Sequence, residues 1–192
     1  MKNVLIILGH PNDDSLSHKI ADSYRKGALE GGANVDFIHV RKLDFEPILF
    51  KGYKRKEALE PDILDAQKRL ERADHVVFIY PNWWGTYPAM FKGFIDKLLW
   101  PGFAFRYRKN SVRPEKLMKG KSVRIFITMD NPWYYYRYVQ GGGGIHAMKH
   151  STLGFCGFSP IRFTILDKVR RASAETIAKR MKKIEKLGKS VR

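Results

Sequence analysis

The chain has 192 residues, 44 % of them apolar, which is typical of one globular domain, and we expect residues 1–192 to form a single one. Its single cysteine, Cys156, excludes an internal disulfide framework and cysteine-rich zinc sites, and it indicates a reducing compartment. The formal net charge is +17, and nearly all of that charge lies in residues 100–192.

The positive charge leaves three classes of partner open: nucleic acid, an anionic membrane surface and phosphorylated ligands. No nucleic-acid-binding motif accompanies the charge, so we favour a solvated basic surface and expect no sequence-specific nucleic-acid binding. Val4–Leu8 is too short for the apolar part of a signal peptide, and no apolar run is long enough to span a membrane. We therefore expect a cytoplasmic protein, while peripheral docking to a membrane stays open.

The first half of the chain predicts three strands, each followed by a helix. Asn3–Leu8 is continuously apolar, which is typical of a buried parallel strand, and Ser15 or Ser17 can cap the helix that follows. That helix ends at Gly31-Gly32. The later strands of this half are Val35–Val40 and His75–Tyr80, and the later helices are Pro61–Ala73 and Pro88–Leu99. A long polar connection, Leu43–Glu60, lies between the second strand and the second helix.

The second half predicts two strands and two helices, separated by long loops. Trp100–Gly120 is basic and shows neither a helical nor a strand period, while Met129–Gly144 carries five aromatic residues ahead of four glycines. The strands are Val123–Thr128 and Ile161–Leu166, and the helices are Ile145–Phe155 and Ser173–Leu187. The last helix is amphipathic, with a predicted inward stripe of Ala174, Ile177, Met181, Ile184 and Leu187.

The alternation of apolar strands with helices predicts an α/β fold. We expect a five-stranded parallel sheet in the flavodoxin-like order 2-1-3-4-5, with helices on both faces. Ligands of such sheets bind at the carboxyl ends of the strands, where the strand order reverses. The loops at that place are Gly9–Ser17 and Pro81–Tyr87, and Met129–Gly144 borders them, so we expect a ligand there.

The first of these loops suits a phosphate group. It leads into a helix N-terminus, whose free N–H groups and dipole attract anions, and His10, Ser15 and Ser17 add hydrogen-bonding groups. Asp13 and Asp14 would repel a phosphate unless they face solvent. The loop has neither the Walker nor the dinucleotide glycine pattern, so helix capping alone stays open as the alternative.

The second loop is unusual for its rings. It carries Trp83, Trp84 and Tyr87 where a plain turn would be small and polar, which suggests a platform for a flat ligand such as an isoalloxazine ring. Ordinary core or interface aromatics are the alternative.

The third loop offers polar groups. Thr128 ends the fourth strand, Asp130 and Asn131 follow it, and His146 lies at a helix start after the glycine run. Histidine changes protonation near neutral pH, so a functional and a structural role for His146 are about equally favoured. The other histidines considered, His18, His39, His75 and His150, are interpreted as structural or solvated.

Several motifs carry a family resemblance. They are Gly-His-Pro-x-x-x-Ser-Leu-Ser from Gly9, Tyr-Pro-Asn-Trp-Trp-Gly-Thr-Tyr-Pro from Tyr80, Pro-Gly-Phe-Ala-Phe from Pro101, Gly-Ile-His from Gly144 and Gly-Phe-Cys-Gly-Phe from Gly154. Over nearly the whole chain these motifs resemble the NAD(P)H:quinone oxidoreductases of the flavodoxin-like fold.

The resemblance implies a cofactor, a substrate and an assembly. These are FAD, with FMN as the alternative, NAD(P)H as hydride donor, a quinone-like acceptor and a homodimer with its active sites at the subunit interface. The flavin-binding residues would be His10, Ser15, Leu16, Ser17, Pro81, Asn82, Trp83, Trp84, Gly85, Thr128, Met129, Asp130 and Asn131. Catalytic roles fall to His146 and to an upstream tyrosine, which we assign to Tyr138, with Tyr134, Tyr135 and Tyr136 open as alternatives.

We therefore expect an NAD(P)H dehydrogenase (quinone)-like enzyme that transfers a hydride from NAD(P)H to quinone-like acceptors. The family's usual Thr-Thr-Gly-Gly after the fourth strand is Thr-Met-Asp-Asn here, starting at Thr128. The alternative is a flavodoxin-like binding or regulatory module whose basic C-terminal half docks nucleic acid or a membrane protein.

Overall fold

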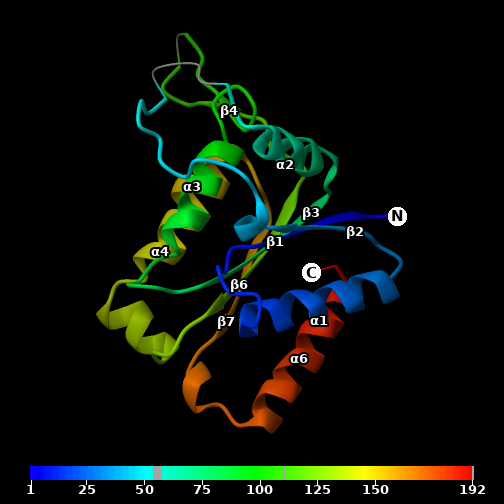
Figure 1. Cartoon of the computed structure of the whole chain (residues 1–192). Coiled ribbons are helices and arrows are strands. Elements are labelled where there is room, and N and C mark those ends of the chain that lie inside the picture. The colour runs from blue at the N-terminus through cyan, green and yellow to red at the C-terminus, as the bar shows by residue number, and fades with distance from the viewer. Residues whose placement is uncertain (54–57, 110, 192) are drawn as a thin grey trace.

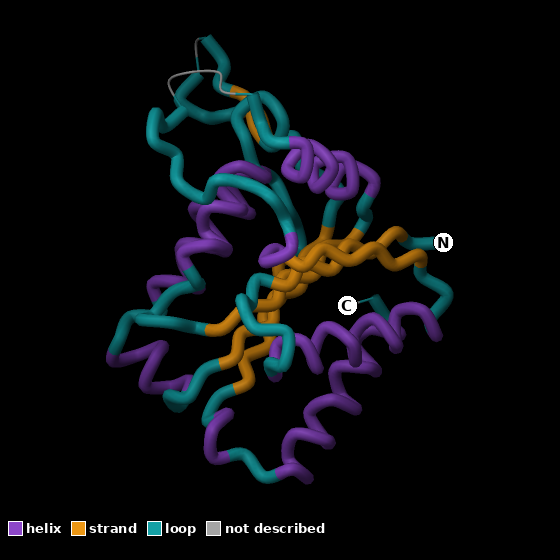
Figure 2. Tube along the Cα trace, in the orientation of Figure 1, coloured by secondary structure: helices purple, strands orange, loops and turns teal. Residues whose placement is uncertain are grey.

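A twisted parallel sheet lies at the centre of the molecule, with helices on both of its faces (Figures 1 and 2). The computed structural model describes residues 1–53, 58–109 and 111–191, so parts of the predicted connections Leu43–Glu60 and Trp100–Gly120 lie outside the described residues. The strands are β1 (Asn3–Leu8), β2 (Asn34–His39), β3 (His75–Pro81), β6 (Ser122–Thr128) and β7 (Ile161–Leu166). Their order, β2-β1-β3-β6-β7, confirms the predicted order 2-1-3-4-5.

The helices divide between the two faces (Figure 1). Helices α1 (Leu16–Glu30) and α6 (Ala174–Lys189) share one apolar cluster with the sheet. The opposite face is covered by α2 (Pro61–Arg72), α3 (Ala89–Leu98) and the helical segment 143–156. That segment consists of α4 (Gly143–His146), a π-helical stretch Ala147–Leu153 and α5 (Gly154–Cys156). Because both faces are covered, the central strands β1 and β3 read as continuous apolar runs.

Helices α1 and α6 cross with their backbones in contact. A Cβ atom on Gly27 would lie 1.9 Å from the carbonyl oxygen of Glu185, and one on Gly188 would lie 2.2 Å from that of Tyr24. The crossing therefore depends on glycine at both positions. It lies toward the C-terminal end of α6, which explains why Ile184 is buried whereas Ala174, predicted to face inward, is exposed.

Two of the predicted loops contain structure that the sequence did not indicate. Trp100–Gly120 includes the two-residue antiparallel strands β4 (Phe105–Arg106) and β5 (Glu115–Lys116), which are too short to show an alternating pattern. Met129–Gly144 includes a π-helical turn, Tyr135–Val139. Short 3₁₀ turns follow β2 at Val40–Lys42 and precede α6 at Val169–Arg171.

Strand register brings the carboxyl ends of the strands to one edge. Leu8 of β1 pairs with His39 of β2 and with Ile79 of β3, and Pro81 pairs with Thr128 of β6. The loops after β1, β3 and β6 therefore start side by side. Within the described ranges, no helix combines the length and apolar character that crossing a membrane requires.

Candidate functional site

The three loops singled out from the sequence meet at the carboxyl edge of the sheet. The Asn82 amide donates to the Thr128 carbonyl at 2.8 Å, which joins the second loop to the third. The Ser17 and Thr128 hydroxyl oxygens lie 3.5 Å apart, and the rings of His10 and Trp83 meet edge to face at 5.9 Å. The predicted convergence of these loops is therefore present.

The first loop ends in a capped helix. Ser15, not Ser17, is the N-cap of α1: its Oγ accepts from the His18 amide at 3.2 Å. Ser17 is buried in the first turn, where its hydroxyl faces Thr128. The cap takes the His18 amide, and the amides of Leu16 and Ser17 at the start of α1 stay available to a nearby anion.

His10 has a defined tautomer. Its Nδ1 accepts from the Asn12 amide at 3.0 Å, so in the neutral ring Nε2 carries the proton. Burial lowers the pKa of His10, and this outweighs the opposing effect of the Asn12 hydrogen bond. His10 is therefore a neutral donor near neutral pH, as a phosphate-side hydrogen bond requires.

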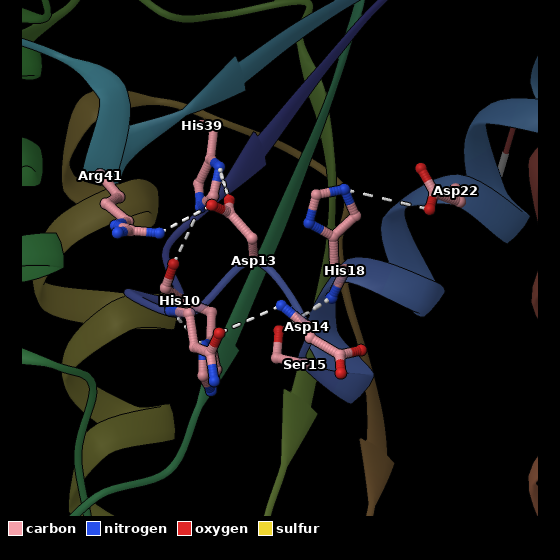
Figure 3. Close-up of polar contacts among 9 residues, drawn as sticks. His10, Asp13, Asp14, Ser15, His18, Asp22, His39 and Arg41 are labelled. Carbon is pink, nitrogen blue, oxygen red and sulfur yellow. Dashed lines mark hydrogen bonds and ion pairs between the residues drawn. The ribbon is translucent and has the colours of Figure 1, made fainter.

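The two acidic residues of the first loop differ in their surroundings (Figure 3). Asp13 Oδ2 accepts from Arg41 at 2.7 Å, and its Oδ1 lies 3.1 Å from His39 Nδ1. Asp14 is exposed, and its amide donates to the Asn12 side chain. A cation thus compensates the Asp13 charge, and Asp14 faces solvent, so neither carboxylate excludes a nearby phosphate.

The second loop is a strained turn. Trp83 and Thr86 exchange two backbone hydrogen bonds, of 2.7 and 3.0 Å, and the central residues Trp84 and Gly85 both have positive φ, of 52° and 79°. This is a type I′ turn, in which a bulky residue such as Trp84 is unfavourable by about 1–3 kcal/mol. The Trp84 side chain is fully exposed, at 102 % of its reference area, so packing within the chain does not repay that strain. Strain held at an exposed ring indicates a functional contact.

The third loop is fastened to that turn. The Tyr136 hydroxyl donates to the Gly85 carbonyl at 3.0 Å and accepts from the Ile145 amide at 3.2 Å. Burial raises the pKa of Tyr136, so the hydroxyl keeps its proton. A Cβ on Gly144 would lie 2.6 Å from the Gly85 carbonyl oxygen, so the glycine run allows close approach to the second loop.

The two proposed catalytic side chains, Tyr138 and His146, have different neighbours. Tyr138 is 75 % exposed and packs against Trp133, with ring centroids 6.0 Å apart. His146 lies 4.9 Å, ring to ring, from His150. Both histidines line a depression over the edge strand β7, together with Trp133, Tyr136, Arg137, Gly142, Ile145, Lys149, Phe163 and Ile165.

The residues after Thr128 are held by neighbouring segments. The Met129 side chain is buried, and its backbone pairs with Leu166 and Val169. Asp130 accepts from the Arg170 amide at 2.9 Å, while Asn131 is exposed. Of the proposed polar edge, Thr128 contacts the first loop directly.

Comparisons with known proteins agree with this geometry. The family model described as a flavodoxin-like fold matches residues 2–188. The chain belongs to this family. It is 29 % identical over 190 residues to an uncharacterized NAD(P)H oxidoreductase of Haemophilus influenzae, covering 93 % of each chain.

Further flavodoxin-like relatives extend the comparison. The chain is 27 % identical to a ribosyldihydronicotinamide dehydrogenase [quinone] of Pongo abelii, covering 82 % of this chain and 78 % of that one. A solved NAD(P)H:quinone oxidoreductase of Methanothermobacter marburgensis has the same fold, with a TM-score of 0.79, 20 % identity, and coverage of 99 % of this chain and 96 % of that one. The resemblance inferred from the motifs is confirmed.

The donor set of this flavodoxin-like edge fits a flavin. It combines a helix N-terminus, a neutral histidine donor, two buried hydroxyls and an exposed ring on a strained turn. Two residues of this edge have positions that the sequence does not indicate. Tyr136 is one of four neighbouring tyrosines, and only its contacts with Gly85 and Ile145 distinguish it. His39, interpreted from the sequence as structural or solvated, is the last residue of β2 and lies at the same carboxyl edge.

Proposed function

We propose that this chain is a flavin-dependent oxidoreductase that transfers a hydride from NAD(P)H to quinone-like acceptors. The observation that carries the proposal is the contact between the loop that leads into α1, through His10, and the exposed, strained Trp84 turn, through Trp83, at the point where strand order reverses. The names of the H. influenzae and P. abelii relatives support it. They give no support to the alternative of a docking module.

In this proposal the first loop binds the flavin phosphate. Its hydrogen-bond donors would be the backbone amides of Leu16 and Ser17, the Ser15 hydroxyl and the His10 Nε2–H. Trp83 and Trp84, with Pro81, Asn82 and Gly85, would line the isoalloxazine, and Thr128 to Asn131 would border its polar edge. We propose FAD as the cofactor, with FMN as the alternative.

A bound flavin would supply the hydride chemistry, and the chain would supply position and electrostatics. The Tyr136 hydroxyl fixes the turn by its bond to Gly85, which orients the Trp83–Trp84 platform. We propose that His146 and Tyr138, on the loop that borders the turn, donate hydrogen bonds where negative charge develops. We further propose a cytoplasmic homodimer.

Trp84→Ala tests the site assignment. An aromatic stacking partner contributes about 0.5–1.5 kcal/mol, so we expect flavin affinity to fall by roughly 2- to 12-fold, measured by fluorescence titration. NAD(P)H oxidation with a soluble quinone should fall in parallel at limiting flavin. Phe50→Ala is the matched control, since Phe50 is also an exposed ring but lies on the 43–53 segment.

Flavin binding to the wild-type chain tests the proposed function itself. If saturating FAD and FMN both leave the fluorescence and the melting temperature of the wild-type chain unchanged, the proposed function is wrong. Equal effects of Trp84→Ala and Phe50→Ala would refute the platform alone.

A further inference from the structure

One cluster at the carboxyl edge has no part in the proposed flavin contacts. It consists of Asp13 on the first loop, His18 in the first turn of α1, and His39 at the end of β2. Each offers one ligand atom, and these atoms all lie within 4.8 Å of one another. Figure 3 shows the Asp13 carboxylate next to the His39 ring, with the His18 ring beside it.

The tautomer of His39 is set by its contact with the backbone. Its side chain is only 3 % exposed, and Nε2 lies 3.0 Å from the His10 carbonyl oxygen. A carbonyl oxygen only accepts, so Nε2 must carry the proton. In the neutral ring, Nδ1 then carries no proton and is an acceptor. It lies 3.1 Å from a carboxylate oxygen of Asp13. Two acceptors this close need a cation between them.

His18 distinguishes a proton from a metal ion as that cation. Its Nδ1 is also buried and, within the described residues, has no hydrogen-bond partner. A proton between Asp13 and His39 would serve that pair alone and leave His18 Nδ1 unsatisfied. A metal ion accommodates all three ligand atoms.

The surroundings are those of a metal site. Ligating histidines donate their second N–H to a carbonyl, and ligating carboxylates are themselves hydrogen-bonded. His39 Nε2 meets the first condition at His10, and Arg41 holds the second oxygen of Asp13 at 2.7 Å. Zn²⁺ bonds of about 2.0–2.1 Å place tetrahedral ligands roughly 3.3 Å apart, close to the 3.1 Å between Asp13 Oδ1 and His39 Nδ1.

We propose that Asp13, His18 and His39 form a binding site for a divalent transition-metal ion of the Zn²⁺ type. Two imidazole ligands disfavour Mg²⁺ and Ca²⁺, which prefer oxygen. The ion ties the loop after β1 to β2 and α1, and its remaining coordination position is free for water or an anion. The site does not depend on the proposed hydride chemistry.

The test is Zn²⁺ titration of the untagged full chain, after chelator treatment, by calorimetry. His146 and His150 lie one helical turn apart and offer zinc a second place, so every variant carries His150→Gln. We expect one Zn²⁺ per chain in this background. Adding Asp13→Asn or His18→Gln should weaken binding by roughly 100-fold or more, whereas Asp14→Asn, the neighbouring carboxylate, should not. Co²⁺ in place of Zn²⁺ should give visible absorption bands that disappear with the same variants.

Several results would overturn the proposal. One is the absence of Zn²⁺ uptake at micromolar concentration in the His150→Gln background, which would leave Asp13 and His39 as an ordinary ion pair. Another is equal loss in Asp14→Asn and Asp13→Asn. Far-UV circular dichroism checks folding, and Asp13, half exposed on a loop, keeps the test valid if a histidine variant misfolds.

Discussion

His75, at the start of β3, is a buried histidine whose protonation opposes folding. Its Nδ1 lies 2.7 Å from the Ser122 hydroxyl. Burial, with the charges of Arg124, Lys2 and Arg162, lowers its pKa to about 4. In the unfolded chain the pKa is about 6.5. Between about pH 4 and pH 6.5, His75 is therefore protonated in the unfolded chain and neutral in the folded chain.

We therefore predict that stability falls as the pH drops from about 6.5 toward 4, by up to about 3 kcal/mol from this group. Urea unfolding at about pH 7.5 and about pH 4.5 measures the change. The loss should be smaller in His75→Gln than in the wild type. The same pH dependence in both proteins would contradict the prediction.

In the proposed function, His146 donates a hydrogen bond where negative charge develops, and a substitution of this residue tests that role. His146→Gln keeps some hydrogen bonding but loses the proton that a histidine can exchange near neutral pH. We expect normal flavin content, a similar Michaelis constant for NAD(P)H, and turnover lower by about 10- to 1,000-fold. Stopped-flow measurement of the two half-reactions locates the defect.

His150→Gln, on the same helical segment, is the control for this substitution. If the rates of both half-reactions were unchanged in His146→Gln, the proposed catalytic role would be wrong and His146 would be a structural residue.

At the scale of elements, the crossing of α1 and α6 is the feature most sensitive to a single methyl group. A Cβ on Gly27 would meet the Glu185 carbonyl at 1.9 Å, and backbone cannot rotate away as a side chain can. We predict that Gly27→Ala destabilises the chain by about 1–3 kcal/mol or more, lowering the melting temperature by roughly 2–4 °C per kcal/mol.

Gly143→Ala is the control, since a Cβ there would contact nothing within 4 Å and its φ is not positive. It should be neutral or slightly stabilising. A melting temperature unchanged by Gly27→Ala would mean that the helices do not cross as described.

The same scale shows what sequence reasoning can reach. The runs Asn3–Leu8 and Ile161–Leu166 match their strands at both ends. For the central strand β1 the reason is burial on both faces, which demands continuous apolar residues. Local capping chemistry limits the start of α1 to Ser15 or Ser17, and the structure has Ser15 as the cap. Local chemistry also places the three loops at one edge, once the alternation fixes the sheet order.

What could not be predicted depends on contacts between distant segments. The hydrogen bond from Tyr136 to Gly85 joins residues 51 positions apart, and four neighbouring tyrosines look alike in sequence. Asp13 faces His39 and Arg41 only because β2 pairs with β1. The exposure of Ala174 follows from where α6 meets α1, which amphipathic spacing alone does not specify.

At the scale of the whole molecule, the edge strand β7 and the loop after β6 form a partly uncovered apolar surface. Ile161, Phe163 and Ile165 of this edge strand stay partly exposed. Beside them, the loop after β6 presents Trp133, Tyr134, Tyr135 and Tyr138 to solvent. Clustered exposed rings next to an apolar strand are typical of a contact surface, and aromatic residues are enriched at interface centres.

We predict that the chain is a homodimer through this face at micromolar concentration, measured by sedimentation or light scattering. Trp133→Glu places a charge in the proposed contact, and a buried unpaired charge should weaken the dimer by at least about 10-fold. Phe50→Glu puts the same charge on a more exposed ring of the 43–53 segment and should leave the dimer intact. A monomeric wild type would contradict the prediction, and so would dissociation caused by Phe50→Glu alone, because the contact would then involve the 43–53 segment.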